Sequence, residues 1–142
     1  MKTLLTLHVL ALGVWIGVVA AEFVIEFDGM KDDASHIKAS KLHYATDIWI
    51  EIPSFMVVLV TGLLMLDADR LSGLFLYKVI FGLLAVAANI VCVYAVFKRR
   101  SYAVSGDIAG MASTDPAMKL GGACFIPTFM IALALGAYFV SR

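Results

Sequence analysis

The sequence predicts an all-α integral membrane protein, with four transmembrane helices forming one antiparallel bundle over residues 1–142. Apolar residues make up 62% of the chain and charged residues only 15%, and the mean hydropathy is +0.94. Soluble domains are about half apolar and about a quarter charged. A single domain of this length has too small an interior to hide such an excess. We therefore expect lipid rather than water around most of its surface.

Four apolar stretches are each long enough to cross a bilayer as a helix, which takes about 20 residues. None of them alternates with a period of two, so strands are not indicated. We expect helices over about 4–26, 42–66, 74–98 and 119–140, centred on the stretches Leu4–Phe23, Ile48–Leu66, Leu74–Phe97 and Leu120–Val140.

Two connections differ in character. The short segment Asp67–Gly73 must join neighbouring helices. The longest loop is expected over Ser101–Met118, which is rich in Ser, Gly, Ala and Asp and contains a turn signal at Asp115–Pro116.

Basic residues are distributed unevenly between the two ends of the expected bundle. An excess of Lys and Arg marks cytoplasmic loops. Seven basic residues follow the first and third helices and three lie at the other end, so we expect both termini outside, in a bacterial inner membrane. The seven are Lys31, Lys38, Lys41, Lys98, Arg99, Arg100 and Lys119, and the three are Lys2, Arg70 and Arg142.

Several functional classes are not supported by the sequence. Eleven basic and eleven acidic residues cancel, so no basic field exists to attract nucleic acid. Cys92 and Cys124 form no CxxC motif and do not indicate a disulfide framework. Nucleotide-binding motifs, a nucleophile elbow and zinc-finger spacing are all missing from the sequence.

Acidic and histidine side chains recur at helical spacing on the first two helices. Glu22 and Glu26 are four residues apart, and His43, Asp47 and Glu51 follow at intervals of four. Residues four apart share one face of a helix. Because a short connection makes the two helices neighbours, we expect these five side chains to converge at one depth.

Carboxylates crowded in a low dielectric repel one another, and a divalent metal would neutralise them. Helical bundles build such carboxylate–histidine sites from facing helices. Carboxylates with one imidazole suit iron, manganese or zinc better than Cu(I). The repeated Glu-x-x-His of di-iron bundles is missing from the sequence.

The alternative interpretation is that these groups are the hydrated ends of two helices, paired with nearby lysines. Glu51 fits that alternative less well, because it lies a turn inside the apolar stretch. A charged side chain at the centre of a membrane helix costs roughly 2.5–3.5 kcal/mol. Glu51 should therefore serve as a ligand or in proton transfer.

His8 and Lys78 lie about one turn inside the membrane at the other end. His8 could simply hydrogen-bond across helices, and Lys78 could reach the headgroups along its flexible stem. The functional interpretation makes His8 an axial ligand of haem b and lets Lys78 pair with a propionate or another anionic group.

The opening Leu7-His8, followed by Trp15-Ile16-Gly17, resembles the first helix of HemJ-type membrane proteins, which are protoporphyrinogen oxidases, and of CopD-like proteins. The likeness continues in order over most of the chain. It implies a four-helix haem-binding protein in which His8 and Lys78 match the functional His and Lys of that family. The other matching segments are Ile52-Pro53, Thr61-Gly62, Tyr77-Lys78-Val79 and Phe125-Ile126-Pro127.

The acidic pairs Glu22/Glu26 and Asp47/Glu51 depart from the HemJ pattern. A HemJ-like scaffold re-purposed around a metal cluster would explain both the likeness and the departure. The leading hypothesis is therefore a membrane protein that binds one or two divalent ions. The alternatives are a haem-dependent oxidoreductase acting on a tetrapyrrole, and an ion- or proton-conducting or accessory subunit, for which conduction would need a homodimer.

Overall fold

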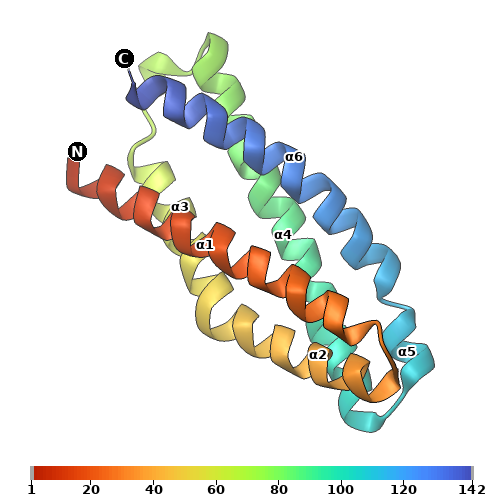
Figure 1. Ribbon diagram of the computed structural model, residues 1–142. Coiled ribbons are helices and arrows are strands. Elements are labelled where there is room, and N and C mark those ends of the chain that lie inside the picture. The colour runs from red at the N-terminus through yellow and green to blue at the C-terminus, as the bar shows by residue number, and fades with distance from the viewer. Residues whose placement is uncertain (1, 142) are drawn as a thin grey trace.

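The computed structural model describes residues 2–141, which are almost entirely helical (Figure 1). No strand occurs among them, so the prediction of an all-helical chain is confirmed. Arg142, which entered the charge count above, lies outside the described residues. The elements are α1 (Lys2–Gly29), α2 (Asp33–Thr46), a π-helical turn η1 (Asp47–Glu51), α3 (Ile52–Leu64), a 3-10 turn η2 (Ala68–Arg70), α4 (Gly73–Ser105), α5 (Ile108–Ala112) and α6 (Asp115–Val140).

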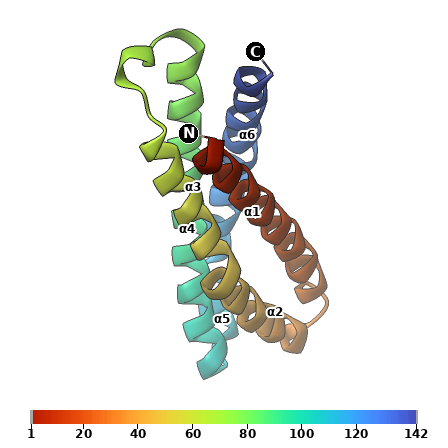
Figure 2. The same ribbon diagram turned by 90° about the vertical axis from the view of Figure 1, so that its left-hand side faces the viewer.

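Four helical spans are long and apolar enough to cross a membrane, as the sequence predicted. The second of them is composite, because α2, η1 and α3 follow one another without a break (Figure 2). The four spans cover Lys2–Gly29, Asp33–Leu64, Gly73–Ser105 and Ile108–Val140.

The spans pack as two pairs. α1 lies along α2 and α3, α4 lies along α6, and contacts between α2 and α4 join the pairs. Both termini lie at one end, and the α1–α2 connection and α5 lie at the other (Figure 1). We call the latter the α5 end of the molecule.

The helices at the α5 end are longer than the apolar stretches indicated. α2 begins already at Asp33, because the Asp32 side chain accepts a hydrogen bond of 2.7 Å from the Ser35 backbone N–H and caps the helix. That bond holds the pKa of the Asp32 carboxyl below its usual range. The expected long loop is mostly helical too. Its Asp115–Pro116 pair starts α6, where the proline costs no hydrogen bond.

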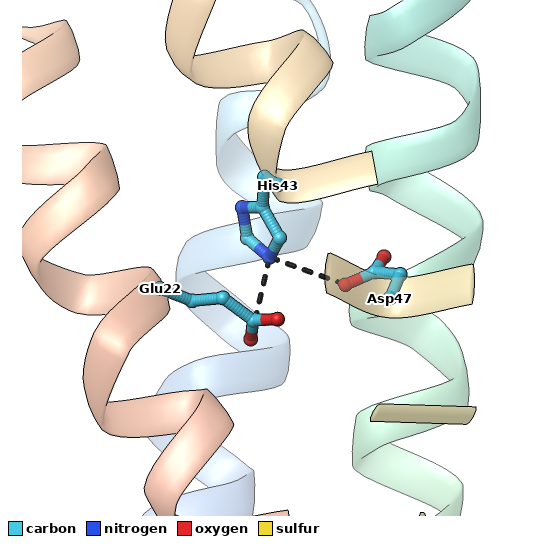
Figure 3. Close-up of side chains that lie close together, drawn as sticks. All are labelled: Glu22, His43 and Asp47. Atoms are coloured by element: carbon cyan, nitrogen blue, oxygen red, sulfur yellow. Dashed lines mark ion pairs between the residues drawn. The ribbon is translucent and has the colours of Figure 1, made fainter. Parts of the chain in front are cut away.

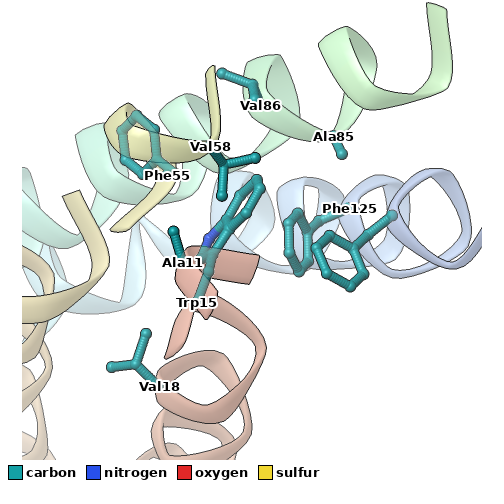
Figure 4. Close-up of a cluster of buried hydrophobic side chains, with 9 residues drawn as sticks. Ala11, Trp15, Val18, Phe55, Val58, Ala85, Val86 and Phe125 are labelled. Atoms are coloured by element: carbon teal, nitrogen blue, oxygen red, sulfur yellow. The ribbon is translucent and has the colours of Figure 1, made fainter. Parts of the chain in front are cut away.

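Four aromatic side chains form the centre of the core, and we call them the aromatic layer: Trp15, Phe55, Phe125 and Phe129. The Trp15 ring, on α1, lies 5.9 Å from that of Phe55 on α3, 5.2 Å from that of Phe125 and 5.4 Å from that of Phe129, both on α6. Trp15 is 1% exposed, and smaller side chains such as Ala11 surround it (Figure 4). This layer holds α6 to the pair formed by α1 and α3.

The close packing of α4 on α6 gives a matched pair of substitutions. A methyl group at Gly121 would overlap Cys92 Sγ and come within 3.2 Å of the Ala88 carbonyl oxygen, whereas one at Gly122 would meet no heavy atom within 4 Å. Overpacking typically costs about 1–3 kcal/mol, and Gly→Ala in an open helical position gains about 0.5–1 kcal/mol. We expect Gly121→Ala to lower the stability of the protein in detergent and Gly122→Ala to leave it unchanged or raised.

Unfolding followed by circular dichroism would measure both variants. Because the two glycines are adjacent in α6, their helix propensities cancel in the comparison. Equal stability of the two variants would contradict the close approach of α4 and α6 at Gly121.

Candidate metal centre

Three of the five predicted ligand residues come together at the α5 half of the molecule, and we call Glu22, His43 and Asp47 the metal centre (Figure 3). Each offers one ligand atom, and these atoms lie within 4.8 Å of one another. His43 Nε2 is 3.5 Å from Glu22 Oε2 and 3.5 Å from Asp47 Oδ1. All three residues are buried. The group could hold a metal ion.

The π-helical turn places Asp47 at this site. Pro53 has no N–H to donate to the carbonyl of Trp49, four residues earlier, and its ring crowds that carbonyl. The backbone widens instead, and the Ile52 N–H donates to the Asp47 carbonyl oxygen, five residues back. Asp47 and Glu51, at the two ends of this turn, are both buried, while Trp49 between them is exposed. Such turns are frequent at functional sites.

Glu26 supports His43 from outside the metal centre. Its Oε1 lies 2.5 Å from His43 Nδ1. Arg99, on α4, donates from Nη1 to Glu26 Oε2 at 2.8 Å and from Nη2 to Glu26 Oε1. A bidentate contact of this kind fixes the carboxylate in position. Glu26, predicted as a metal ligand, therefore pairs with a guanidinium and orients the imidazole.

Arg99 is a functional residue that the sequence reasoning missed. It was counted as a charge in a cytoplasmic loop, yet its side chain is 2% exposed. The sequence does contain a signal for the burial of Arg99. Asn89, Cys92, Val96 and Arg99 follow one another at steps of three and four, so they lie on one face of α4. Of these, Asn89, Val96 and Arg99 are buried.

Glu51 lies beside the metal centre rather than within it. Its carboxyl neighbours those of Asp47 and Glu22 and the Asn89 side chain, and the residue is 3% exposed. Among the described residues, the Asn89 Nδ2 atom is buried and has no hydrogen-bond partner. Glu51 therefore adds negative charge close to the site without joining its compact ligand group.

The negative charges of this region outnumber the positive ones. Four carboxylates, those of Glu22, Glu26, Asp47 and Glu51, face one permanent cation, Arg99, and one imidazole, His43, which is charged only when protonated. Arg99 is committed to Glu26, so the other three carboxylates share one imidazole. Carboxylates clustered in a low dielectric cannot all ionise without further positive charge.

Asp47 is the least satisfied member of the group. It is 0% exposed, and neither of its carboxylate oxygens has a hydrogen-bond partner among the described residues. Leaving a buried acceptor unpaired costs about 1–3 kcal/mol, and more when it is charged. An additional positive group at this position would remove that cost.

A cavity of 840 Å³ reaches the metal centre from the α5 end. Glu22 and His43 line it, together with Glu26, Asn89 and Arg99. The ligand atoms of α1 and α2 are therefore accessible from this cavity.

The structure places His8 and Lys78 in the other half of the molecule. His8 Nδ1 lies 2.9 Å from Thr61 Oγ1, and the Thr61 hydroxyl donates to the Val57 carbonyl oxygen at 2.5 Å. With the Thr61 hydroxyl donating to Val57, Nδ1 is the donor in this contact, and a neutral imidazole then carries its lone pair on Nε2. Lys78 Nζ lies over the Phe75 ring, 5.4 Å from its centroid.

The chain matches no protein-family model, no curated protein and no solved structure. The resemblance to HemJ-type proteins thus stays a prediction. What bears on function is the geometry of the two polar groups on either side of the aromatic layer.

The contact between Arg99 and Glu26 predicts a large loss of stability when it is broken. Arg99→Gln leaves Glu26 without its cationic partner in a mostly buried position, and breaking a buried ion pair costs about 3–5 kcal/mol. The double variant Glu26→Gln/Arg99→Met removes both charges and should recover most of that loss. Chemical unfolding in detergent would measure the difference.

Arg100→Gln is the control, because Arg100 stacks over the Tyr44 ring at 4.7 Å and makes no part of this pair. It should lose no more than about 1 kcal/mol. If the double variant were as unstable as the sum of its single substitutions, the two side chains would not be energetically coupled.

Proposed function

We propose that this chain is an integral membrane protein, an antiparallel bundle of four transmembrane helices, that binds a divalent metal ion through Glu22, His43 and Asp47. The observation that carries the proposal is the Asp47 carboxylate, which is fully buried, lacks hydrogen-bond partners among the described residues and faces His43 Nε2. A bound cation supplies the missing positive charge at that point.

The spacing of the ligand atoms supports an ion rather than direct hydrogen bonds. A distance of 3.5 Å from His43 Nε2 to each carboxylate exceeds the usual N–H···O range of about 2.7–3.2 Å. Metal–nitrogen and metal–oxygen bonds of about 2.1 Å at tetrahedral angles separate two ligand atoms by about 3.4 Å. The distances from His43 Nε2 to the two carboxylates therefore match the separation of ligands around one small cation.

Glu26 and Arg99 complete the arrangement. Histidine ligands of metals commonly donate their second ring N–H to a carboxylate, which fixes the tautomer and raises the basicity of the ligating nitrogen. His43 Nδ1 has such a partner in Glu26 Oε1, and Arg99 holds that carboxylate. The pattern leaves Nε2, the atom that faces Glu22 and Asp47, free to ligate.

Two carboxylates and one imidazole favour manganese, iron or zinc. Three protein ligands leave at least one coordination position for water or a substrate. The excess of basic residues at the α5 end supports a cytoplasmic location for this end, with the chain in a bacterial inner membrane.

The decisive test is metal content. Protein purified in detergent and equilibrated with Mn²⁺, Fe²⁺ or Zn²⁺ should retain about one ion per chain for at least one metal, as measured by elemental analysis. Glu22→Gln and Asp47→Asn should each abolish retention, because each removes an anionic ligand. Glu26→Gln should weaken binding by about 10–100-fold without removing a ligand.

Asp28→Asn is the matched control, since it removes a carboxylate from α1 that is exposed and paired with Lys31. It should retain the ion fully. A wild-type protein that holds no more metal than the Glu22→Gln/Asp47→Asn double variant, with helicity intact in both, would refute the proposal.

A second candidate function is haem binding by a HemJ-like oxidoreductase that acts on a tetrapyrrole. The observation that favours it is the His8 ring, whose Nδ1 is held by Thr61 and whose Nε2 keeps its lone pair. Haem irons are commonly held by such an imidazole. Haem b would supply redox chemistry at that position, and Lys78 would pair with an anionic group.

Under this second candidate, protein purified from haem-replete cells should show a Soret band that His8→Ala removes. His36→Ala, on α2 at the α5 end, is the control and should keep the band. A colourless wild-type preparation would count against haem binding and leave the metal centre unaffected.

A further inference from the structure

Three layers follow one another along α1. His8, Trp15 and Glu22 are separated by seven residues each, which is about two helical turns, so they share one face. His8 belongs to the polar pair with Thr61, Trp15 to the aromatic layer and Glu22 to the metal centre. The aromatic layer thus separates the two polar groups of the interior.

The aromatic layer is closely packed. Its four side chains come from α1, α3 and α6, and their exposed fractions are between 1% and 5%. The indole N–H of Trp15 has no hydrogen-bond partner among the described residues. A buried, packed apolar layer is a barrier to a hydrated cation, as in the hydrophobic constrictions of channels.

The cavity lies on one side of this layer only. Phe125, a member of the aromatic layer, also lines the cavity, so the layer forms part of its inner wall. Towards the α5 end the same cavity is lined by Asp32 and Asp33 at the α1–α2 connection and by Asp115 at the start of α6. Lys31 and Lys119 line it as well. Charged side chains therefore lie both at the α5 end of this largely apolar cavity and at its inner end, where Glu22 and His43 line it.

We propose that the metal centre exchanges its ion with one side of the membrane only, the side of the α5 end, and that the aromatic layer bars the other side. This inference rests on the proposed metal-binding function. It makes the bound divalent ion an exchangeable one that enters and leaves through the cavity, rather than a structural ion locked into the bundle.

The test uses Zn²⁺ as the probe, because it binds N/O sites more tightly than Mn²⁺ or Fe²⁺ and has no redox chemistry. Zn²⁺-loaded protein is reconstituted into sealed liposomes, where its orientation is mixed. External EDTA does not cross the bilayer, so it removes zinc only from molecules whose metal centre opens outwards. Retained zinc is measured by elemental analysis after gel filtration.

A cysteine at the α5 end reports the orientation. Ala34 is exposed in the first turn of α2 and does not line the cavity. With Cys92 and Cys124 replaced by alanine, Ala34→Cys is labelled by an impermeant maleimide in outward-facing molecules. We expect the fraction of zinc removed by EDTA to equal the fraction labelled, and a membrane-permeant chelator to remove all of it.

Removing a ring from the aromatic layer should let zinc leave towards both sides of the membrane. In Trp15→Ala, EDTA should remove zinc from both orientations, so that the removed fraction exceeds the labelled fraction and approaches the whole. Phe129→Ala serves as a second variant with a smaller cavity, in case the loss of the indole impairs folding.

Three results for the protein with its aromatic layer intact would overturn the inference. Zinc could be removed from both orientations, from the unlabelled fraction alone, or from neither. In the last case the ion is bound but locked, and the proposed function survives. Protein that carries no zinc before EDTA is added, and that retains neither Mn²⁺ nor Fe²⁺, contradicts the proposed function itself, so the two failures are distinguishable.

Discussion

The structure depends on the pairing of buried carboxylates with positively charged groups, because the interior of the bundle solvates charge poorly. Arg99 and His43 both contact Glu26, which makes this carboxylate the junction of α1, α2 and α4. An ion pair in such surroundings adds little net stability, but losing one partner is costly. The contact therefore acts mainly as a constraint, fixing which helices meet at the α5 end and in which register.

That constraint also determines what His43 can do. With Nδ1 committed to Glu26, the imidazole presents Nε2 to Glu22 and Asp47. Thr46 fixes the Glu22 side chain in turn, since its hydroxyl lies 2.9 Å from Glu22 Oε1. Most of the polar contacts around the site hold its members in place, whereas neither Asp47 oxygen has a hydrogen bond among the described residues, and Asp47 Oδ1 has only the 3.5 Å contact with His43 Nε2. Positioned neighbours around an under-satisfied carboxylate are what a ligand site requires.

The sequence predicted the helices and the residues that meet at the candidate site. It did not predict which of these residues face the candidate ligand position and which hold their neighbours in place. The apolar composition of four stretches reveals the helices. The helical spacing of the acidic and histidine residues reveals that Glu22, His43 and Asp47 can meet. Helix ends were underestimated, because α2 starts in a polar segment whose signal is the single cap at Asp32. The role of Arg99 was hidden by its place among basic residues that mark a cytoplasmic loop, although a stripe on α4 leads to it. Whether Glu26 ligates an ion or supports a histidine depends on side-chain geometry, which spacing alone does not determine.

The aromatic layer explains how one small bundle can carry two polar groups without coupling them. Trp15 fills the space between Glu22 and His8 with apolar surface, and Phe125 and Phe129 close it from α6. Charge at the α5 end therefore acts on His8 only across the packed aromatic layer. The proposed metal binding at Glu22, His43 and Asp47 and the proposed haem binding at His8 would then be independent of each other. Glu22, Glu26, Asp47 and Glu51 all lie on the α5 side of the layer, and His8 and Lys78 lie on the other, so the two proposals concern separate groups of residues.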